Sequence, residues 1–215
     1  PPRSTLFPYT TLFRSVDAIG IPRIDAVVTS RGRIVADHVV IACGVWSNRL
    51  ANMAGATIPL TPTVHQMADV GPIDVLAATN NEIGYPIVRD MDTLCYERQT
   101  AGSMEVGSYA HRPIFHHPDT IPSNEESALS PTELPLSQDD FDPAMEQAIE
   151  LMEVLGDAEI KYAINGLLSL TPDAMPVIGE TVEVENLWSA AAVWIKEGPG
   201  IGQLEIGRAS CRERV

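Results

Sequence analysis

Basic residues, cysteines and long apolar runs are all scarce in this chain of 215 residues. It has 14 lysines and arginines against 29 acidic residues, and the basic residues form no patch. Nucleic acids and anionic membranes need such a patch, so we expect neither as a partner. The three cysteines include no C-x-x-C pair, which excludes a disulfide framework. No apolar run approaches the roughly 20 residues of a membrane span. These absences favour a cytoplasmic protein.

The two ends of the chain are related at the level of DNA. Residues 5–15 read T-L-F-P-Y-T-T-L-F-R-S, and one DNA string that encodes them has a reverse complement that, shifted by one base and preceded by a G, encodes residues 205–215. This inverted repeat looks like a sequencing adapter translated at both ends of an insert. We therefore expect residues 1–15 and 205–215 to be adapter-derived, and 16–204 to come from a longer parent protein. Cys43 and Cys95 are then its only cysteines.

Local patterns in the first part of the interior predict strands. β-branched residues over 24–30, a turn at Arg31-Gly32 and apolar residues at 34–36 predict a hairpin. The apolar run 38–43 ends at Gly44 and is typical of a strand buried on both faces in a parallel sheet. Residues 46–54 have helical character.

The middle of the chain predicts an antiparallel meander followed by a helix. Residues 58–70 indicate a bent strand, and short strands are expected at 86–89, 94–99 and 103–108. Residues 116–135 are expected to form a long surface connection. A helix follows, with an acidic first turn at 137–140. Its apolar face is expected to comprise Phe141, Met145, Ala148, Ile149, Met152 and Leu155. Strands are expected again at 160–170 and 187–194.

Two motifs indicate a cofactor domain. The first, T-S-R-G-R-I-V-A-D-H-V-V-I-A-C-G at 29–44, is by spacing alone a hairpin and a buried strand. Its small end residues would let the backbone approach a bulky cofactor. It resembles the second fingerprint of glutathione-reductase-type FAD domains, which implies that Cys43 and Gly44 lie beside the flavin nucleotide.

The second motif is N-G-L-L-S-L-T-P-D-A-M-P-V-I-G at 165–179. Taken alone, its Thr-Pro-Asp is an ordinary turn. With the following proline and glycine it resembles the C-terminal signature of the D-amino-acid-oxidase superfamily, in which a glycine-rich helix start lies against the isoalloxazine. Here that start would be K-E-G-P-G-I-G-Q at 196–203, whose N–H groups would stabilise a reduced flavin. The resemblance implies that Pro172, Asp173, Gly198 and Gly200 contact FAD.

The resemblance becomes specific over 39–65, 104–113 (M-E-V-G-S-Y-A-H-R-P) and 141–196. These stretches are similar to the dimethylglycine oxidase, dimethylglycine dehydrogenase and sarcosine dehydrogenase group. The resemblance implies an α/β fold: an incomplete FAD-binding domain of glutathione-reductase type with an inserted antiparallel β substrate domain. The FAD-binding parts would be 16–54 and 159–204, and the substrate domain 55–158.

The same resemblance implies a reaction. The family oxidises an N-methylated glycine, dimethylglycine or sarcosine, by hydride transfer to flavin N5. It passes one carbon to folate in a C-terminal domain. This chain lacks the family's N-terminal G-x-G-x-x-G, the histidine that holds FAD covalently, and the folate domain. We therefore expect 16–204 alone to be poorly soluble, to bind no FAD and to be inactive.

His65, in T-V-H-Q-M, matches the family's active-site histidine. From the residue alone, a histidine on a strand is structural as readily as catalytic; in the family position it would take up or orient the amine proton. The family has Tyr-Tyr where this chain has Cys95-Tyr96, and the first tyrosine is the one associated with catalysis. Tyr96 would point to the opposite face from Cys95. The expected substrate-binding residues are Tyr96, Tyr109, Arg112 and Trp194.

Alternatives remain open at this point. The superfamily includes a regulatory subunit of pyruvate dehydrogenase phosphatase, a non-catalytic homologue, and the Cys95 replacement points that way. Another secondary amine or amino acid is also open as substrate. His116, His117 and Asp119 resemble a metal site, but adjacent residues on an extended loop point apart, so we expect no metal.

Overall fold

The computed structural model describes residues 11–16, 20, 22–79, 81–122, 126–127 and 130–212. The chain divides into two compact units. Unit 1 comprises residues 1–63, 115–131 and 168–215, and unit 2 comprises residues 64–114 and 132–167. The divisions at 63/64 and 167/168 fall inside the long strands β5 (Thr61–Gly71) and β10 (Glu159–Leu170). They therefore differ from the segment ends expected from the sequence, and 115–131 returns to unit 1.

Unit 1 contains a mixed sheet in the order β11 (Val177–Glu180), β12 (Leu187–Ala191) and β4 (Val39–Ile41). β12 and β4 are parallel, whereas β11 and β12 are antiparallel. The parallel strand expected near 38–43 is therefore confirmed. Its expected burial on both faces is wrong, because Val40 is 50% exposed while Ile41 is buried.

A second sheet of unit 1 is the predicted hairpin with one further strand. β2 (Pro22–Thr29) pairs with β3 (Gly32–Val35) across the expected turn, and β1 (Thr11–Val16) pairs with the other edge of β2. Most of β1 thus comes from the segment expected to be adapter-derived. Residues 1–10 and 213–215 of the expected adapter segments lie outside the described residues, while 205–212 continue the last helix.

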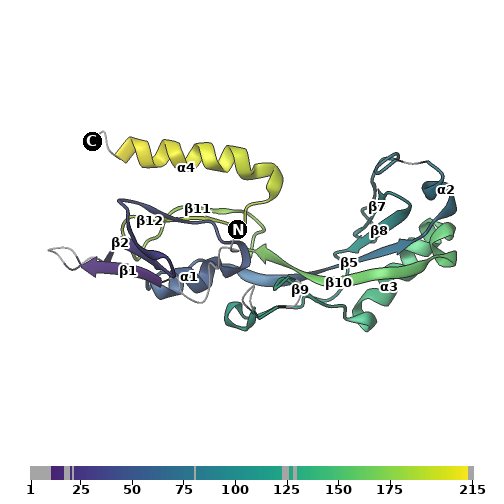
Figure 1. The fold of residues 1–215 in the computed structure, drawn as a ribbon, viewed down its shortest axis with the longest axis horizontal. Coiled ribbons are helices and arrows are strands. Elements are labelled where there is room, and N and C mark those ends of the chain that lie inside the picture. The colour runs from purple at the N-terminus through teal and green to yellow at the C-terminus, as the bar shows by residue number, and fades with distance from the viewer. Residues whose placement is uncertain are drawn as a thin grey trace. The chain divides into compact units, whose positions relative to one another are not determined.

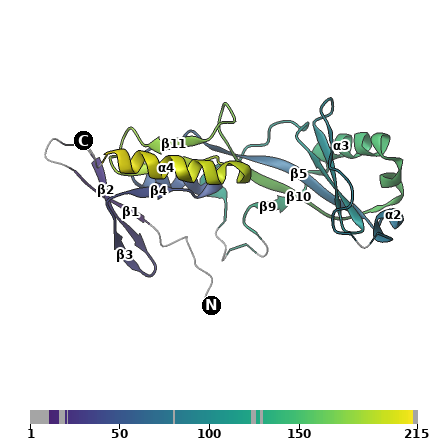
Figure 2. The same cartoon turned by 90° about the horizontal axis from the view of Figure 1, so that it is seen from above.

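Helices α1 (Ser47–Met53) and α4 (Gly198–Arg212) belong to unit 1. A 3₁₀ turn, Gly44–Trp46, leads into α1, and another, Ile195–Glu197, leads into α4. Figures 1 and 2 both show α4 running along the sheet that contains β11. The core of unit 1 consists of apolar side chains from β2, β4, α1, β12 and the segments beside them, including Ile24, Ile41, Leu50, Ala51, Ile58 and Leu187.

Unit 2 is built on an antiparallel sheet in the order β6-β7-β8-β5-β10-β9, to which unit 1 contributes only strand ends. Strands β6 (Val88–Asp90), β7 (Cys95–Thr100) and β8 (Ser103–Ser108) form the predicted meander, which is confirmed. A short strand, β9 (Glu133–Pro135), pairs with β10 and follows a 3₁₀ turn, Pro118–Thr120, in the long connection.

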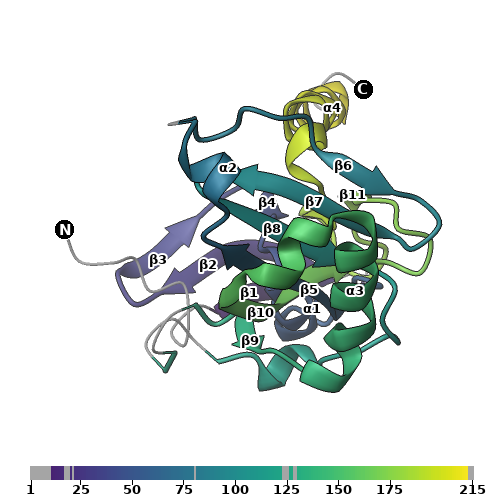
Figure 3. The same cartoon turned by 90° about the vertical axis from the view of Figure 1, so that its right-hand side faces the viewer.

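Helix α3 (Gln138–Leu151) covers one face of this sheet, as Figure 3 shows. The predicted apolar face is confirmed, because all six of its residues belong to the core of unit 2 or pack against it. The helix ends at Leu151, so Met152 and Leu155 of this face follow it, and a 3₁₀ turn, Glu153–Asp157, continues the chain. A short helix, α2 (Asp74–Ala77), adds Leu76 to the same core. No helix within the described ranges is long and apolar enough to cross a membrane.

Candidate functional site

The alternation of β5 places His65 on the sheet face opposite α3. Val64, Gln66 and Ala68 are buried on the side of the helix, while His65 and Met67 point the other way. On β7, Cys95 is buried in the α3 core, so its neighbour Tyr96 shares the face of His65. One sheet face thus collects polar and aromatic side chains around His65.

Both ring nitrogens of His65 are engaged. Nδ1 lies 2.9 Å from the carbonyl oxygen of Ser108, and Nε2 lies 3.1 Å from the hydroxyl of Tyr96. Burial is the largest influence on His65 and lowers its pKa to about 4, with His111 and Arg89 contributing in the same direction. At neutral pH the ring is therefore uncharged.

This environment selects one tautomer of His65. A carbonyl oxygen can only accept, so Nδ1 carries the proton and donates to Ser108. Nε2 is then a lone pair and accepts from the Tyr96 hydroxyl. Glu105 Oε1, 3.3 Å from that hydroxyl, competes for the same single proton. The hydroxyl therefore has two acceptors within reach, His65 Nε2 and Glu105 Oε1.

The hydroxyl of Tyr96 is held by packing on a glycine as well as by these contacts. Burial and the nearby Glu105 raise the pKa of Tyr96, which therefore stays protonated. Arg98 donates to Glu105 at 2.6 Å and holds that carboxylate in place. A side chain at Gly107 would overlap the Tyr96 ring, so only glycine permits this ring position. No positive φ is involved at Gly107; the requirement is close approach.

Tyr109 and Arg89 complete the cluster. The Tyr109 ring stacks on His65 at a centroid distance of 4.2 Å and an interplanar angle of 19°. The Arg89 guanidinium carbon lies 5.7 Å from the Tyr109 ring centroid, within the range of a cation–π contact. In the part of the chain that the structure describes, no carboxylate forms an ion pair with Arg89. Its charge is therefore available to an anionic group beside His65.

Arg112, the arginine expected from the sequence to bind substrate, is already paired. Arg112 forms a two-pronged ion pair with Asp140, with Nε 2.9 Å from Oδ1 and a second nitrogen 3.1 Å from Oδ2. A substrate carboxylate would have to displace Asp140. Arg89 had no sequence signal beyond its place on a short strand next to Tyr96, with which it pairs across β6 and β7. Trp194 lies in unit 1, at the start of the 3₁₀ turn before α4.

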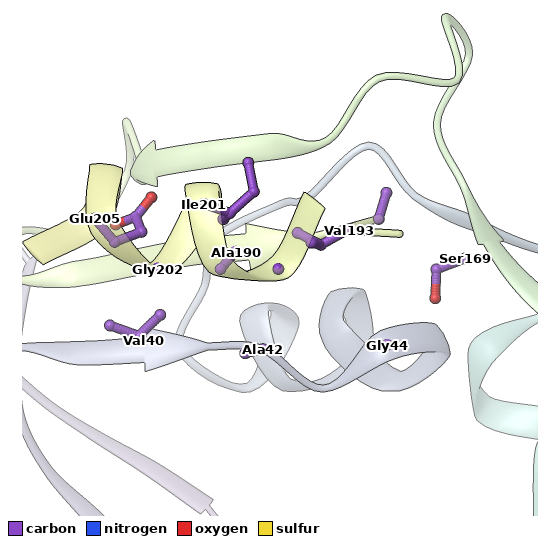
Figure 4. A pocket seen from close by; sticks show the side chains of 11 residues that line it. Val40, Ala42, Gly44, Ser169, Ala190, Val193, Ile201, Gly202 and Glu205 are labelled. Atoms are coloured by element: carbon purple, nitrogen blue, oxygen red, sulfur yellow. The ribbon is translucent and has the colours of Figure 1, made fainter. Parts of the chain in front are cut away.

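Unit 1 holds a groove of about 530 Å³ beside β4, β12 and α4, seen closely in Figure 4. Small and apolar residues dominate its walls. The lining consists of Val40, Ala42, Gly44, Ser169, Ala190, Ala192, Val193, Gly198, Ile201, Gly202 and Glu205. Its size falls within the range of ligand pockets. Glu205, from the segment expected to be adapter-derived, contributes its one charged wall residue and is 8% exposed.

Two of the six expected cofactor residues line this groove, Gly44 and Gly198. Cys43 packs against the core of unit 1, and burial raises the pKa of its thiol. Asp173 closes its own turn by accepting from the Met175 amide and the Thr171 hydroxyl, contacts that lower its pKa. This is the ordinary turn that the motif also allowed. Pro172 and Gly200 are exposed outside the lining.

Most of the lining residues that were not expected from the sequence share a pattern of small or apolar residues with Gly44. Val40, Ala42 and Gly44 alternate along one side of β4 and its extension, and Ala190 and Ala192 do so at the end of β12. Gly44 adopts φ +54, which disfavours other residues, and a Cβ there would lie 3.6 Å from Ser169 Oγ. Nothing lies within 4 Å of a Cβ at Gly198. Small residues thus leave room for a flat, bulky group.

His117 and Asp119, which resembled metal ligands in the sequence, have a local structural role. His117 Nδ1 accepts from the Asp119 amide at 3.3 Å and caps the 3₁₀ turn Pro118–Thr120. The Asp119 carboxylate lies 3.6 Å from the same nitrogen and 3.8 Å from Arg49. Across the described residues, no three histidine, cysteine, aspartate or glutamate side chains are grouped as metal ligands.

Comparison with known families and proteins shows which family the chain resembles. The family model described as "FAD dependent oxidoreductase" matches residues 10–205. The chain is 32% identical over 180 residues to 4-methylaminobutanoate oxidase (formaldehyde-forming) of Paenarthrobacter nicotinovorans, covering 82% of this chain and 21% of that protein. It is 30% identical over 167 residues to human mitochondrial dimethylglycine dehydrogenase, covering 76% and 19%. The chain thus spans about a fifth of these relatives.

Solved structures share the fold. Iminodiacetate oxidase from Chelativorans sp. BNC1 superposes with a TM-score of 0.63 at 17% identity, over 93% of this chain and 48% of that one. L-proline dehydrogenase from P. horikoshii gives 0.61 at 24% identity, over 86% and 44%. The expected α/β fold, with an antiparallel sheet in unit 2, is confirmed.

Proposed function

Because the chain belongs to the FAD dependent oxidoreductase family, we propose that its parent protein oxidises an N-methylated amino acid. The observation that carries this proposal is the His65 cluster on one sheet face: a neutral imidazole, two tyrosines and an arginine that has no ion pair among the described residues. The names of the relatives support the substrate class, since they act on methylaminobutanoate, dimethylglycine and sarcosine.

FAD is the cofactor of this family. We propose that its ring system lies in the groove of unit 1, whose walls are mostly small or apolar residues. A Cβ at Gly198 would meet nothing within 4 Å, and one at Gly44 would meet Ser169 Oγ at 3.6 Å, so both glycines leave open space beside the backbone. The N–H groups at the start of α4 would favour negative charge on a reduced ring. When bound, FAD would accept the hydride from the N-methyl carbon at its N5.

His65 and Tyr96 are proposed to orient the amine together. An aliphatic ammonium has a pKa near that of lysine, about 10, roughly six units above the value of about 4 at His65. Complete proton transfer from ammonium to His65 is therefore strongly uphill. The Tyr96 oxygen, whose proton is directed to His65 or Glu105, keeps its lone pairs for an amine N–H. The pair thus aligns the amine rather than acting as a strong base.

Arg89 is proposed to hold the substrate carboxylate. A guanidinium binds a carboxylate through two parallel hydrogen bonds, and Arg89 stands beside Tyr109 without a competing acid among the described residues. We expect Arg89→Gln in the parent enzyme to raise KM for dimethylglycine about tenfold or more, the effect of losing one charged contact. Arg112→Gln is the matched control, because Asp140 already occupies that arginine.

Anaerobic mixing tests the proposal as a whole. Dimethylglycine, sarcosine and 4-methylaminobutanoate are added separately to the FAD-loaded parent enzyme, and loss of the visible flavin absorbance is followed. At least one should bleach the flavin, and His65→Asn should slow bleaching. A protein that binds FAD and is bleached by none of these or by other secondary amines would contradict the enzyme proposal and favour the regulatory homologue.

The fate of the carbon is part of the same proposal. The iminium formed by oxidation would be hydrolysed to formaldehyde, as the name of one relative specifies, or captured by folate in a further domain. Formaldehyde release with and without added tetrahydrofolate separates these two outcomes.

The regulatory alternative drew on the Cys95 replacement. Cys95 is 1% exposed in the α3 core, on the sheet face away from His65. The residue beside His65 is Tyr96. The replacement therefore leaves the phenol of the cluster in place, which supports the catalytic proposal.

A further inference from the structure

Besides the groove of unit 1, the structure has a cavity in unit 2, on the face of the sheet opposite His65. It has a volume of about 340 Å³ and is mostly apolar, with walls from α2, β6, β7, β8 and the end of α3. Its lining consists of Leu76, Tyr85, Pro86, Val88, Glu97, Gln99, Met104 and Met152. Because Tyr96 and Glu97 are neighbours on β7, the cavity and the His65 cluster use opposite faces of the same strand.

Glu97 is the one ionisable carboxylate in these walls and is 1% exposed. Both of its carboxylate oxygens are buried, and neither has a hydrogen-bond partner among the described residues. Gln99, two residues on, makes the contrast plain. Its amide nitrogen donates to the carbonyls of Asn81 and Ala101 at 3.2 and 2.9 Å, and its oxygen accepts from Gly84 at 2.7 Å.

A buried carboxylate without a partner is costly, so folded proteins pair such groups or keep them protonated. Burial raises the pKa of Glu97, and nearby Asp90 adds to the effect. The described residues of the cavity wall include no lysine, arginine or histidine that could supply a counter-charge. The partner that would satisfy Glu97 as an anion must therefore enter from outside the unit.

We propose that this cavity binds a small organic cation, an ammonium with an apolar body, with Glu97 as its counter-ion. The apolar walls would take up the carbon body, and the carboxylate would accept from the ammonium N–H groups. A metal ion does not fit, because it would need several oxygen ligands and the Gln99 oxygen is already bound to Gly84. An anion would be repelled by Glu97.

The cation site is separate from the proposed substrate site, and its chemistry differs. The His65 face offers Arg89 to a carboxylate, so it suits an amino acid. The Glu97 cavity offers no cation, so it suits an amine without a carboxylate. Three compounds of one shape distinguish these cases: benzylammonium, benzyl alcohol and phenylacetate.

The first test is calorimetric binding to the FAD-loaded parent enzyme. Benzylammonium should bind more tightly than benzyl alcohol, and phenylacetate should not bind at this cavity. Glu97→Gln should weaken benzylammonium at least tenfold, roughly the effect of removing one buried charge partner. Glu150→Gln removes an exposed carboxylate from α3 and should leave the affinity unchanged. Equal binding of the alcohol, or unchanged affinity in Glu97→Gln, would overturn the proposal.

The second test locates the ligand by NMR of methionine methyl groups. Met104 and Met152 line the cavity, whereas Met67 lies on the other face of the sheet with His65. Benzylammonium should shift the first two signals and leave Met67 in place. A shift of Met67 alone would place the ligand at the His65 face and reject the cavity. This readout needs only the wild type, so it decides the question even if Glu97→Gln does not fold.

Discussion

At the scale of single residues, the neighbours Cys95 and Tyr96 have different roles: Cys95 packs in the α3 core, whereas Tyr96 lies beside His65. We expect Tyr96→Phe in the parent enzyme to lower kcat/KM for dimethylglycine about fivefold, because losing the hydroxyl that would orient the amine removes about 1 kcal/mol of binding. Flavin reduction in stopped flow measures this. The free energy of unfolding should also fall by about 1 kcal/mol, because the hydrogen bond of the hydroxyl is lost while the ring remains beside Gly107.

Cys95→Ala is the matched change on the other face of β7. It removes a buried sulfur from the α3 core and should lower the free energy of unfolding by about 1 kcal/mol, as for a small cavity. The rate of flavin reduction should stay the same. If Cys95→Ala slowed reduction and Tyr96→Phe did not, the assignment of Tyr96 to the site would be wrong.

The burial of His65 predicts how the free energy of unfolding depends on pH. Its pKa is about 4 in the folded protein and 6.5 ordinarily, so between these values the unfolded chain binds more protons. Stability that His65 contributes is present above about pH 6.5 and is lost as the pH falls toward 4, by about 3 kcal/mol in total. Urea unfolding of the wild type and His65→Asn at about pH 7.5 and about pH 5 measures the loss. A wild-type loss no greater than that of the variant would contradict the buried, neutral ring.

At the scale of elements, β8 positions the site through a glycine. Gly107→Ala would force the Tyr96 ring off the sheet and away from His65, because a Cβ would overlap the ring. We expect a loss of about 1–3 kcal/mol in stability, as for overpacking, and slower flavin reduction. Gly166→Ala on β10 is the control, since its Cβ would meet the His65 carbonyl oxygen at 3.5 Å and Ile164 Cδ1 at 3.7 Å, both ordinary contact distances. Equal effects of both substitutions would show that backbone flexibility, rather than ring packing, explains the result.

The elements themselves were largely predictable, and the reason is local. The β2–β3 hairpin, the β6–β8 meander and the apolar face of α3 follow from turn residues and from periods of two and 3.6. The exposure of Val40 was not predictable, because an apolar run reads the same whether both faces are covered or one lines a groove.

The role of a site residue could not be predicted from the sequence where it depends on a partner far away in the chain. Arg112 pairs with Asp140, 28 positions away, and nothing local distinguishes it from Arg89, which has no such partner among the described residues. His65 and Tyr96, by contrast, were nominated from a motif and do meet. Motifs thus supplied residues, while only the fold showed which of their charges are already neutralised.

At the scale of the whole molecule, each unit has its own core, and β5 and β10 contribute to both units. We expect the two ligands to act on different sets of amides in the parent enzyme. FAD should slow hydrogen exchange in β4 and β12, which line the groove of unit 1. A non-oxidised N-methyl amino acid analogue should slow exchange in β6, β7 and β8, which carry Arg89, Tyr96 and the Gly107 support.

The physical reason is that bound ligands suppress local opening of the segments that contact them. Mass-spectrometric exchange on the apo protein, with FAD alone, and with FAD plus the analogue separates the two effects. Unchanged exchange in β4 and β12 on addition of FAD would remove the groove as the cofactor site. Protection of β6 that survives Arg89→Gln would instead remove Arg89 as the carboxylate contact, and would leave the groove assignment intact.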